Sequence, residues 1–260
     1  MRIGIDVGGT FTDVVAASGD EVIIEKAPTT PNDPSDGVLQ ALTQVAERRD
    51  ESLNDLLAAT DRIVHGTTVA TNALLERKGA RVGLLTTDGH RDVLEMREGL
   101  KADRYNLRLP PPIPLVPRHR RLGVRERIRA DGSVDIALDP RSLDDAIATL
   151  RAQAVDAVAV CYLHSYRDPS HERATRDALA RALPDAYISL SSDVLPQIKE
   201  YERVSTTVVN AYVGPVVAKY FARLESRLQN NGYQAQVLIE RQHDQRRRAG
   251  PAARSTPCWR

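Results

Sequence analysis

Short runs of apolar and β-branched residues alternate along this chain with longer stretches in which apolar residues recur at helical spacing. This alternation is typical of an α/β protein, in which helices cover a largely aliphatic sheet. The first three runs, at 2–7, 11–17 and 21–27, are separated only by the turn sequences GGT and SGD. Such close spacing predicts an antiparallel meander.

A second strand and helix pattern follows the meander. Residues 61–68 predict a strand that runs into a helix at 69–80, and Gly79 can close this helix. The run at 81–87 is apolar enough to be a buried strand. Together these segments predict a β-α-β unit.

The segment 107–118 contains five prolines, which exclude a helix and favour an extended run linking two lobes. Periodicity predicts a helix with Val38, Leu42 and Val45 on one face, and further helices at 140–153, 169–183 and about 205–228. Pro215 is expected to kink or divide the last of these helices. Turn residues and β-branched runs predict a hairpin within 121–138 that turns at Asp131 and Gly132, and strands at 155–166, 186–194 and 234–240.

We therefore expect an N-terminal α/β subdomain at 1–108 with a hairpin that binds phosphate, a second α/β subdomain at 109–239, and a basic, disordered tail at 240–260. The 260 residues include 42% apolar but only 4% aromatic residues, so aliphatic side chains must form the core. Two cysteines are too few for a disulfide framework, and no leader or apolar run of membrane-spanning length is present. We expect a soluble, cytoplasmic protein.

Charge is unevenly distributed, because the net charge of +1 depends on six arginines at 240–260. Without that segment, 30 basic and 33 acidic residues remain, a net charge of −3. A mildly acidic body argues against nucleic acid as the ligand. The tail leaves one alternative open, a basic arm for nucleic acid or a membrane surface.

The most informative stretch is DVGGTFTD, residues 6–13. Gly8 and Gly9 would let the backbone turn with positive φ and keep side chains away, so that amide groups point at an anion. The stretch matches neither GxGxxG nor GxxxxGK[ST], which disfavours the dinucleotide fold and the P-loop. The simpler alternative is a β-turn in which Asp and Thr make local backbone bonds. In the phosphate interpretation, hydroxyl donors come from Thr10 and Thr12, and Mg²⁺ is held by Asp6 and Asp13.

DVGGTFTD resembles the first phosphate motif of the actin, Hsp70 and sugar-kinase superfamily. The stretches at 65–96, 114–128, 157–172 and 200–215 extend the likeness, and the chain to about residue 239 resembles the hydantoinase A and 5-oxoprolinase family. That family includes the beta-type subunits of acetone and acetophenone carboxylases. The resemblance implies an actin-like (ribonuclease H-like) ATPase lobe with a mixed sheet flanked by helices.

The resemblance also implies an ATP- and Mg²⁺-dependent reaction on a cyclic amide or a ketone. Phosphorylation of an amide oxygen would make the ring carbon open to attack by water, and the carboxylase relatives would phosphorylate an enolate and bicarbonate. Positions that match the family's motifs imply the role of each residue. The nucleotide and magnesium would be bound by Asp6, Gly8, Gly9, Thr10, Thr12 and Asp13. Catalysis would involve His65, Thr67 and Thr68, and the substrate would be bound by Thr71, Asn72 and Arg97.

Each of these roles has a structural alternative. At the predicted strand-to-helix junction, Thr67 or Thr68 could simply cap the helix, and His65 could be a hydrogen-bonded core histidine. Arg97 could belong to a solvated ion pair with Glu98, beside Tyr105, instead of a substrate pocket. A zinc site at His171 and Glu172 is excluded, because the second histidine of the zinc motif is missing. We expect structural roles for the other candidates: Glu200 to Arg203 as a charged helix start or interlobe clamp, and Cys161 as a packing residue.

The chain departs from the family after the strand at 234–240. Relatives continue with a Met-Gln-Ser-x-Gly-Gly type stretch and a second lobe, whereas the segment 240–260 resembles GC-rich DNA translated in a shifted frame. We expect a truncated N-terminal half that is inactive alone, with a second lobe or a hydantoinase B-like subunit as partner. Two alternatives remain: a non-catalytic assembly module, and an enzyme like a sugar or acetate kinase.

Overall fold

The computed structural model describes residues 1–30, 33–99, 103, 105–106, 108–110 and 112–239. Contacts divide the chain into two compact units, residues 1–77 with 216–260, and residues 78–215. The expected boundary at 108 falls inside the second unit, and the expected tail at 240–260 lies outside the described residues. The proline content of 107–118 favoured a linker there, but proline content does not by itself mark the point in the sequence at which the chain passes from one unit to the other.

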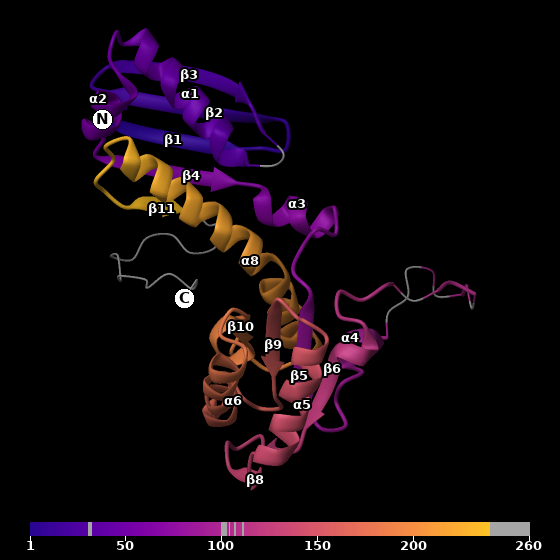
Figure 1. Ribbon diagram of the computed structural model, residues 1–260. Coiled ribbons are helices and arrows are strands. Elements are labelled where there is room, and N and C mark those ends of the chain that lie inside the picture. Colours follow the sequence, from indigo (N-terminus) through magenta and orange to yellow (C-terminus); the bar gives the residue numbers. More distant parts are fainter. Residues whose placement is uncertain (31–32, 100–102, 104, 107, 111, 240–260) are drawn as a thin grey trace. The chain divides into compact units, whose positions relative to one another are not determined.

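The first unit contains a five-stranded mixed sheet in the order β11-β4-β1-β2-β3 (Figure 1). The expected meander is confirmed, because β2 pairs antiparallel with both β1 and β3. On the other side of β1, β4 and then β11 pair in parallel. The strands are β1 (Arg2–Val7), β2 (Phe11–Ser18), β3 (Glu21–Pro28), β4 (Arg62–Thr67) and β11 (Val237–Ile239).

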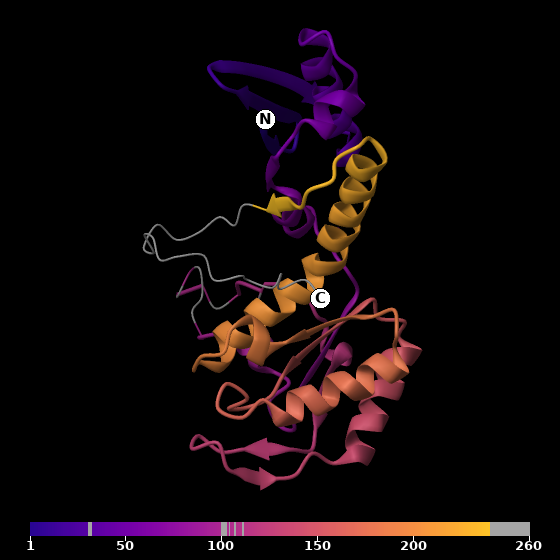
Figure 2. The ribbon, with the colours of Figure 1, turned by 90° about the vertical axis from the view of Figure 1, so that its left-hand side faces the viewer.

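Helices cover one face of this sheet, as Figures 1 and 2 show for α1. The helix expected from Val38, Leu42 and Val45 is α1 (Pro34–Arg48), and all three side chains are buried. It begins at Asp33, whose carboxylate accepts the Ser35 amide. The unit also contains α2 (Leu53–Ala58), α3 (Val69–Leu75) and the later part of α8 (Glu200–Asn230).

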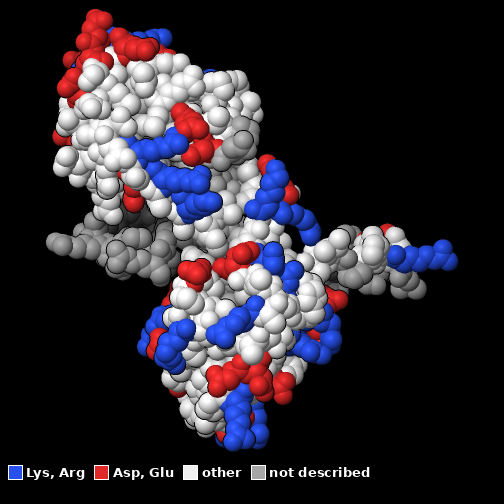
Figure 3. Space-filling view, viewed as in Figure 1, with Lys and Arg blue, Asp and Glu red and all other residues white. Residues whose placement is uncertain are grey.

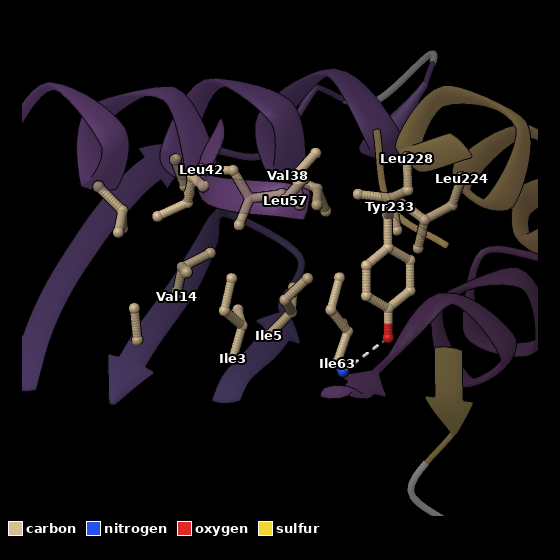
Figure 4. Packing of buried hydrophobic residues seen from close by; sticks show 14 of the residues in the cluster. Ile3, Ile5, Val14, Val38, Leu42, Leu57, Ile63, Leu224, Leu228 and Tyr233 are labelled. Atoms are coloured by element: carbon tan, nitrogen blue, oxygen red, sulfur yellow. Dashed lines mark hydrogen bonds between the residues drawn. The ribbon is translucent and has the colours of Figure 1, made fainter. Parts of the chain in front are cut away.

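The core of the first unit lies between the sheet and these helices (Figure 4). Alternate residues of β1, Ile3 and Ile5, pack beneath α1, and Leu224 of α8 joins the same cluster. Tyr233 closes one end, since its hydroxyl accepts the backbone N–H of Ile63 at 3.0 Å. Burial of alternate strand residues on one face fixes the register of the sheet, because a one-residue slip would expose the core set.

The other face of this sheet carries an apolar row across all five strands. The register aligns Leu238, Val64, Gly4, Val15 and Ile24 side by side. Ile24 is 62% exposed, and the other apolar side chains of the row are 37 to 41% exposed. Contiguous exposed apolar side chains can mark an interaction surface.

The second unit contains a four-stranded parallel sheet in the order β10-β9-β5-β6. Here the expected β-α-β unit is wrong, because β4 and β5 belong to different sheets. Periodicity identifies a strand but does not specify its neighbours in the sheet. All six residues of β5 are buried, which an internal position between β9 and β6 satisfies. The strands are β5 (Val82–Thr87), β6 (Arg121–Val124), β9 (Ala157–Cys161) and β10 (Tyr187–Leu190).

Two helices pack together on one face of the second sheet. The helices α5 (Pro140–Ala152) and α6 (Ser170–Ala182) contribute Leu143, Leu150 and Leu179 to one core. The expected hairpin is confirmed, and Gly132 adopts φ 93° in its turn. The other elements are α4 (Val93–Met96), the 3₁₀ turn η1 (Arg118–Arg120), β7 (Arg127–Ile128), β8 (Val134–Ile136), α7 (Ser191–Val194) and the first part of α8.

Two glycines have roles of close packing within the second unit. Gly79 does not close a helix, because α3 already ends at Leu75. A Cβ atom at Gly79 would instead lie 2.3 Å from the Tyr212 ring of α8, and one at Gly214 would lie 2.6 Å from Tyr187. Pro215 does not divide α8, which is continuous for 31 residues.

A buried polar cluster connects α8 to α6 in the second unit. The Arg203 guanidinium is 2% exposed and donates to Ser165 Oγ at 2.7 Å and to the Tyr162 carbonyl at 2.8 Å. Glu172, completely buried, accepts from Ser191 Oγ at 2.6 Å and from the Tyr162 amide at 3.0 Å. Hydrogen bonding of both charges explains how they are tolerated in the interior. Arg203 is therefore a buried structural residue of the second unit, and the expected charged helix start or interlobe clamp is wrong for this side chain.

Charges on the surface are mixed. In the view of Figure 3, Lys and Arg side chains are interspersed with Asp and Glu over the described part of each unit. One example lies at the start of α1, where Asp33 contacts Arg223 at 3.6 Å and Arg227 at 3.2 Å. Within the described residues, no helix combines the length and the hydropathy needed to cross a bilayer.

Candidate functional site

The hairpin between β1 and β2 is built around one backbone bond. The Gly8 amide donates to the Phe11 carbonyl at 3.0 Å, and the Thr29 amide of the following strand end donates to Thr10 at 2.9 Å. The amides of Gly9 and Thr10 have no hydrogen-bond partner in the described part of the chain. Free adjacent N–H groups in a loop without bulky side chains can bind an anion by donating hydrogen bonds to it.

The two glycines do not act through positive φ, which corrects the expectation. Neither Gly8 nor Gly9 is among the glycines in the left-handed region. Space is the requirement instead: a Cβ at Gly8 would lie 3.1 Å from the Phe11 carbonyl oxygen. At Gly9, which is exposed, a Cβ would point to Asn72 Nδ2 at 3.5 Å. A side chain there would narrow the approach to the free amides.

Two carboxylates lie next to the hairpin. Asp6 and Asp13 are direct cross-strand partners, on the sheet face opposite to the core. Asp13 is paired with Lys26 at 3.1 Å, whereas Asp6 is exposed and makes no ion pair within the described residues. Like charges placed directly opposite each other destabilise a sheet, so this pair is a favourable location for a cation.

The hydroxyl groups of the motif point in different directions. Thr12 is completely buried, and its Oγ1 lies 3.0 Å from Thr29 Oγ1 on the core side of the sheet. Thr10 is exposed in the turn. Of the two threonines expected at the phosphate, only Thr10 is therefore at the surface of the hairpin.

The HGTT stretch lies directly beside the hairpin, because β4 pairs with β1 through Thr67 opposite Val7. Thr68 is bonded to the Val7 carbonyl by both its amide, at 3.0 Å, and its hydroxyl, at 3.1 Å. Asn72 follows one helical turn later and donates from Nδ2 to Thr68 Oγ1 at 3.3 Å. The Thr67 hydroxyl accepts the Val69 amide at 3.1 Å, as the capping alternative anticipated.

His65 lies on the opposite side of the sheet from Asp6 and Asp13. Its side chain is completely buried, Nε2 lies 2.6 Å from the Tyr220 hydroxyl, and the Phe221 ring packs edge-on against it. Burial lowers the pKa of His65 to about 4. Its position is that of the core histidine that we considered as the alternative.

Thr71, Arg97 and Tyr220 lie at other positions in the fold. Thr71 is exposed on α3, and Arg97 belongs to the second unit, where it lies at the end of α4 with φ 56°. Tyr220, the partner of His65, was missed from the sequence. Only its spacing with Leu224 and Leu228 on α8 marks it, and that spacing indicates a core position without indicating which residue it contacts.

A mixed sheet whose first hairpin offers free amides and flanking carboxylates defines a class of α/β lobe suited to phosphate binding. Comparison with known proteins then specifies the family. The chain matches the hydantoinase/oxoprolinase N-terminal region over residues 2–183, and it belongs to that family. The resemblance read from its motifs is confirmed.

Individual relatives are similar over most of this chain. The caprolactamase subunit alpha of Pseudomonas jessenii is 44% identical, covering 90% of this chain and 34% of the relative. The crystal structure of the ATP-dependent caprolactamase from that organism matches with a TM-score of 0.85 at 43% identity, over 92% of this chain and 35% of that one. A nucleotide-free acetone carboxylase structure matches with a TM-score of 0.83 at 27% identity, over 92% and 36%.

These matches confirm the expected α/β fold with sheets flanked by helices. The chain spans about a third of the length of these relatives. It corresponds to the N-terminal portion of a hydantoinase/oxoprolinase-like protein.

Proposed function

We propose that this chain supplies the phosphate-binding lobe of an ATP-dependent enzyme that opens a cyclic amide. The observation that carries the proposal is the β1–β2 hairpin, in which the free amides of Gly9 and Thr10 lie next to Asp6 and Asp13. The match to a protein described as an ATP-dependent caprolactamase supports both the nucleotide and the substrate class.

The reaction proceeds by activation of the amide oxygen. That oxygen attacks the γ-phosphorus of ATP, the bond to the ADP oxygen breaks, and an imidate-like phosphate forms. A water molecule then adds to the ring carbon, and the carbon–nitrogen bond breaks with a proton transferred to nitrogen, which leaves an acyl phosphate. A second water hydrolyses this acyl phosphate to the carboxylate and inorganic phosphate. The free amides of Gly9 and Thr10 hold the phosphate chain in place, which is the main requirement of phosphoryl transfer.

Asp6 and Asp13 fit a magnesium ion in this scheme. Mg²⁺ in nucleotide sites is held by one or two carboxylates together with phosphate oxygens and water. No cluster of three or more His, Cys, Asp or Glu side chains that could hold a metal occurs among the described residues, so a site built by the protein alone is not indicated there. When bound, the ion would neutralise charge on the phosphates.

The HGTT stretch is assigned to the substrate side of the same site. Thr68 is bonded to Val7 of the hairpin, Asn72 is bonded to Thr68, and Thr71 is exposed on the same helix. These contacts support assigning the three residues to the amide ring. His65 is proposed as a positioning residue, because its buried imidazole contacts Tyr220 behind β4. Thr67 shapes the start of α3 through its bond to Val69.

A second lobe or a partner subunit is proposed to complete the enzyme, and the isolated chain is proposed to be inactive. The relative described as a caprolactamase alpha subunit supports a multi-subunit assembly. The exposed apolar row through Val64, Val15 and Ile24 supports a covering partner. Dependence on ATP leads us to propose a cytoplasmic location.

A second candidate function is favoured by the likeness to acetone carboxylase. The same lobe would then bind the ATP that activates an enolate and bicarbonate. Product analysis on the assembled enzyme separates the two, since the hydrolase forms an amino acid from a lactam without bicarbonate, whereas the carboxylase requires bicarbonate and forms a keto acid.

The test is nucleotide binding by the 260-residue chain, measured by titration calorimetry with ATP in the presence of Mg²⁺ and then with EDTA. We expect binding that weakens about tenfold or more with EDTA, and likewise in Asp6→Asn or Gly9→Val. Asp20→Asn, in the exposed turn between β2 and β3, is the matched control and should leave the affinity unchanged. Equal affinity of Asp6→Asn and Asp20→Asn for ATP would refute the assignment.

A further inference from the structure

A cavity of about 540 Å³ lies entirely within the second unit, away from the hairpin residues in sequence. Its walls come from the end of α4, the strand β7, the segment after β9 and the start of α8. The volume is within the range typical of sites for small ligands. Apolar side chains of Val93, Met96 and Leu163 form part of the lining, and charged side chains form much of the rest.

Three separate segments reach this cavity with left-handed backbone. Arg97 has φ 56°, His164 has φ 55° and Lys199 has φ 82°, and all three line the cavity. Residues other than glycine rarely adopt this conformation, which is unfavourable and concentrates at ligand sites. Half of the six such residues among those described thus meet at one cavity, although they are far apart in the sequence.

The charged lining is balanced in sign. The guanidinium groups of Arg97 and Arg127 make no ion pair with any described residue, although both line the cavity. Lys199 is paired with Glu202 at 3.0 Å. Glu98 and Glu200 bring carboxylates to the same walls. Three cationic and three anionic side chains therefore surround an aliphatic patch.

We propose that this cavity binds a small zwitterion whose carboxylate and ammonium groups are separated by a short aliphatic chain. Its carboxylate contacts Arg97 and Arg127, because a guanidinium group binds a carboxylate through paired hydrogen bonds. Its ammonium contacts the carboxylates of Glu98 and Glu200, and its methylene groups pack on Val93 and Leu163. A ligand with only a negative charge would leave the glutamates without a partner of opposite charge, and a ligand with only a positive charge would do the same to the arginines.

The ligand class follows from the lining alone, but its significance rests on the proposed function. Opening a lactam ring by hydrolysis gives an amino acid with a carboxylate at one end and an ammonium group at the other. The cavity then serves as a binding site for that product. Binding is expected without nucleotide, because no residue of the β1–β2 hairpin lines the cavity.

The experiment is titration of the full 260-residue chain, without ATP or Mg²⁺, with 6-aminohexanoate as the probe. Hexanoate and hexylamine, each carrying one of the two charges, are the comparison probes. We expect 6-aminohexanoate to bind at least tenfold more tightly than either. Equal affinity for hexanoate, or no binding of 6-aminohexanoate, overturns the proposal while leaving the ATP-binding test of the hairpin unaffected.

Two variants locate the binding. Arg127→Gln should weaken 6-aminohexanoate binding at least tenfold, whereas Arg125→Gln, an exposed neighbour outside the cavity, should not. Arg97→Gly removes a guanidinium and also relieves the left-handed strain, so binding should fall while the melting temperature stays level or rises. Unchanged binding in both Arg127→Gln and Arg97→Gly overturns the assignment to this cavity.

Discussion

The imidazole Nε2 of His65 lies 2.6 Å from the hydroxyl oxygen of Tyr220, although the two residues are 155 positions apart in the sequence. The contact joins β4 to α8 inside the core of the first unit. It also places a titratable ring beneath the strand that carries Thr67 and leads to Thr68. The same buried pair therefore links the stability of this unit to the position of residues at the candidate site.

The burial of His65 predicts a pH dependence of folding. Its pKa is about 4 in the folded protein and near 6.5 when unfolded, so the unfolded chain binds the extra proton between these values. The free energy of unfolding should therefore be highest above pH 6.5 and should fall by about 3 kcal/mol as the pH decreases to 4. Urea unfolding at a series of pH values measures this slope.

His65→Gln should flatten that slope, because glutamine does not titrate. His119, which is exposed, provides the matched control. A His119→Gln variant should retain the loss of stability below pH 6.5. If His65→Gln keeps the full slope, the buried imidazole is not its source.

Gly79 predicts a steric effect within the second unit. In Gly79→Ala the new methyl group would meet the Tyr212 ring at 2.3 Å, and Tyr212 is itself buried. We expect a loss of about 1–3 kcal/mol in the free energy of unfolding, the usual result of overpacking. Gly4→Ala is the control, since its nearest heavy atom lies at 3.9 Å. Equal stability of the two alanine variants would exclude the clash.

The buried hydrogen bonds of Arg203 predict a large contribution of this residue to the free energy of unfolding. Arg203→Met removes the donors to Ser165 and to the Tyr162 carbonyl and should cost about 3 kcal/mol or more, because buried acceptors lose their partners. Denaturant midpoints measure this, with exposed Arg173→Met as the control.

A double-mutant cycle with Glu172→Gln tests whether the cluster acts as a unit. Ser165 and Ser191 connect the two charged residues through hydroxyls 3.0 Å apart. We expect the double variant to lose less stability than the sum of the two single variants. Strict additivity would mean that the two charges are energetically independent.

The burial of Cys161 predicts that its thiol does not react with reagents in the folded protein. The thiol is buried, and burial raises its pKa to about 12, so almost no thiolate forms at neutral pH. In a Cys258→Ser background, Ellman's reagent at pH 8 should not react with the native chain and should detect one thiol after unfolding in urea. Rapid reaction of the native protein would contradict the packing role.

Local signals in the sequence were sufficient for the elements and for the family. The meander at β1–β3 follows from β-branched runs separated by GGT and SGD, and α5 follows from one apolar face. The DVGGT and HGTT stretches also carried enough identity to indicate the family that the comparison confirmed. These features depend on neighbours within a few residues, which the sequence displays directly.

Partners across long distances were not predictable. The sequence showed that 61–68 and 81–87 are strands, yet it did not reveal that β4 and β5 belong to different sheets. Gly79 looked like a helix end, but contact with Tyr212 explains it. In both cases the decisive neighbour lies on a segment distant in the sequence, and periodicity contains no information about it.

The sequence alone thus determined the α/β class, most of its helices and strands, and the chemistry available in the hairpin, because each follows from local spacing and residue type. Only the tertiary structure decided which groups are accessible. Burial placed His65 against Tyr220, turned Thr12 into the core, and left Asp6 and Asp13 together on the open face. Accessibility depends on packing between distant segments, and that packing exists only once the chain has folded.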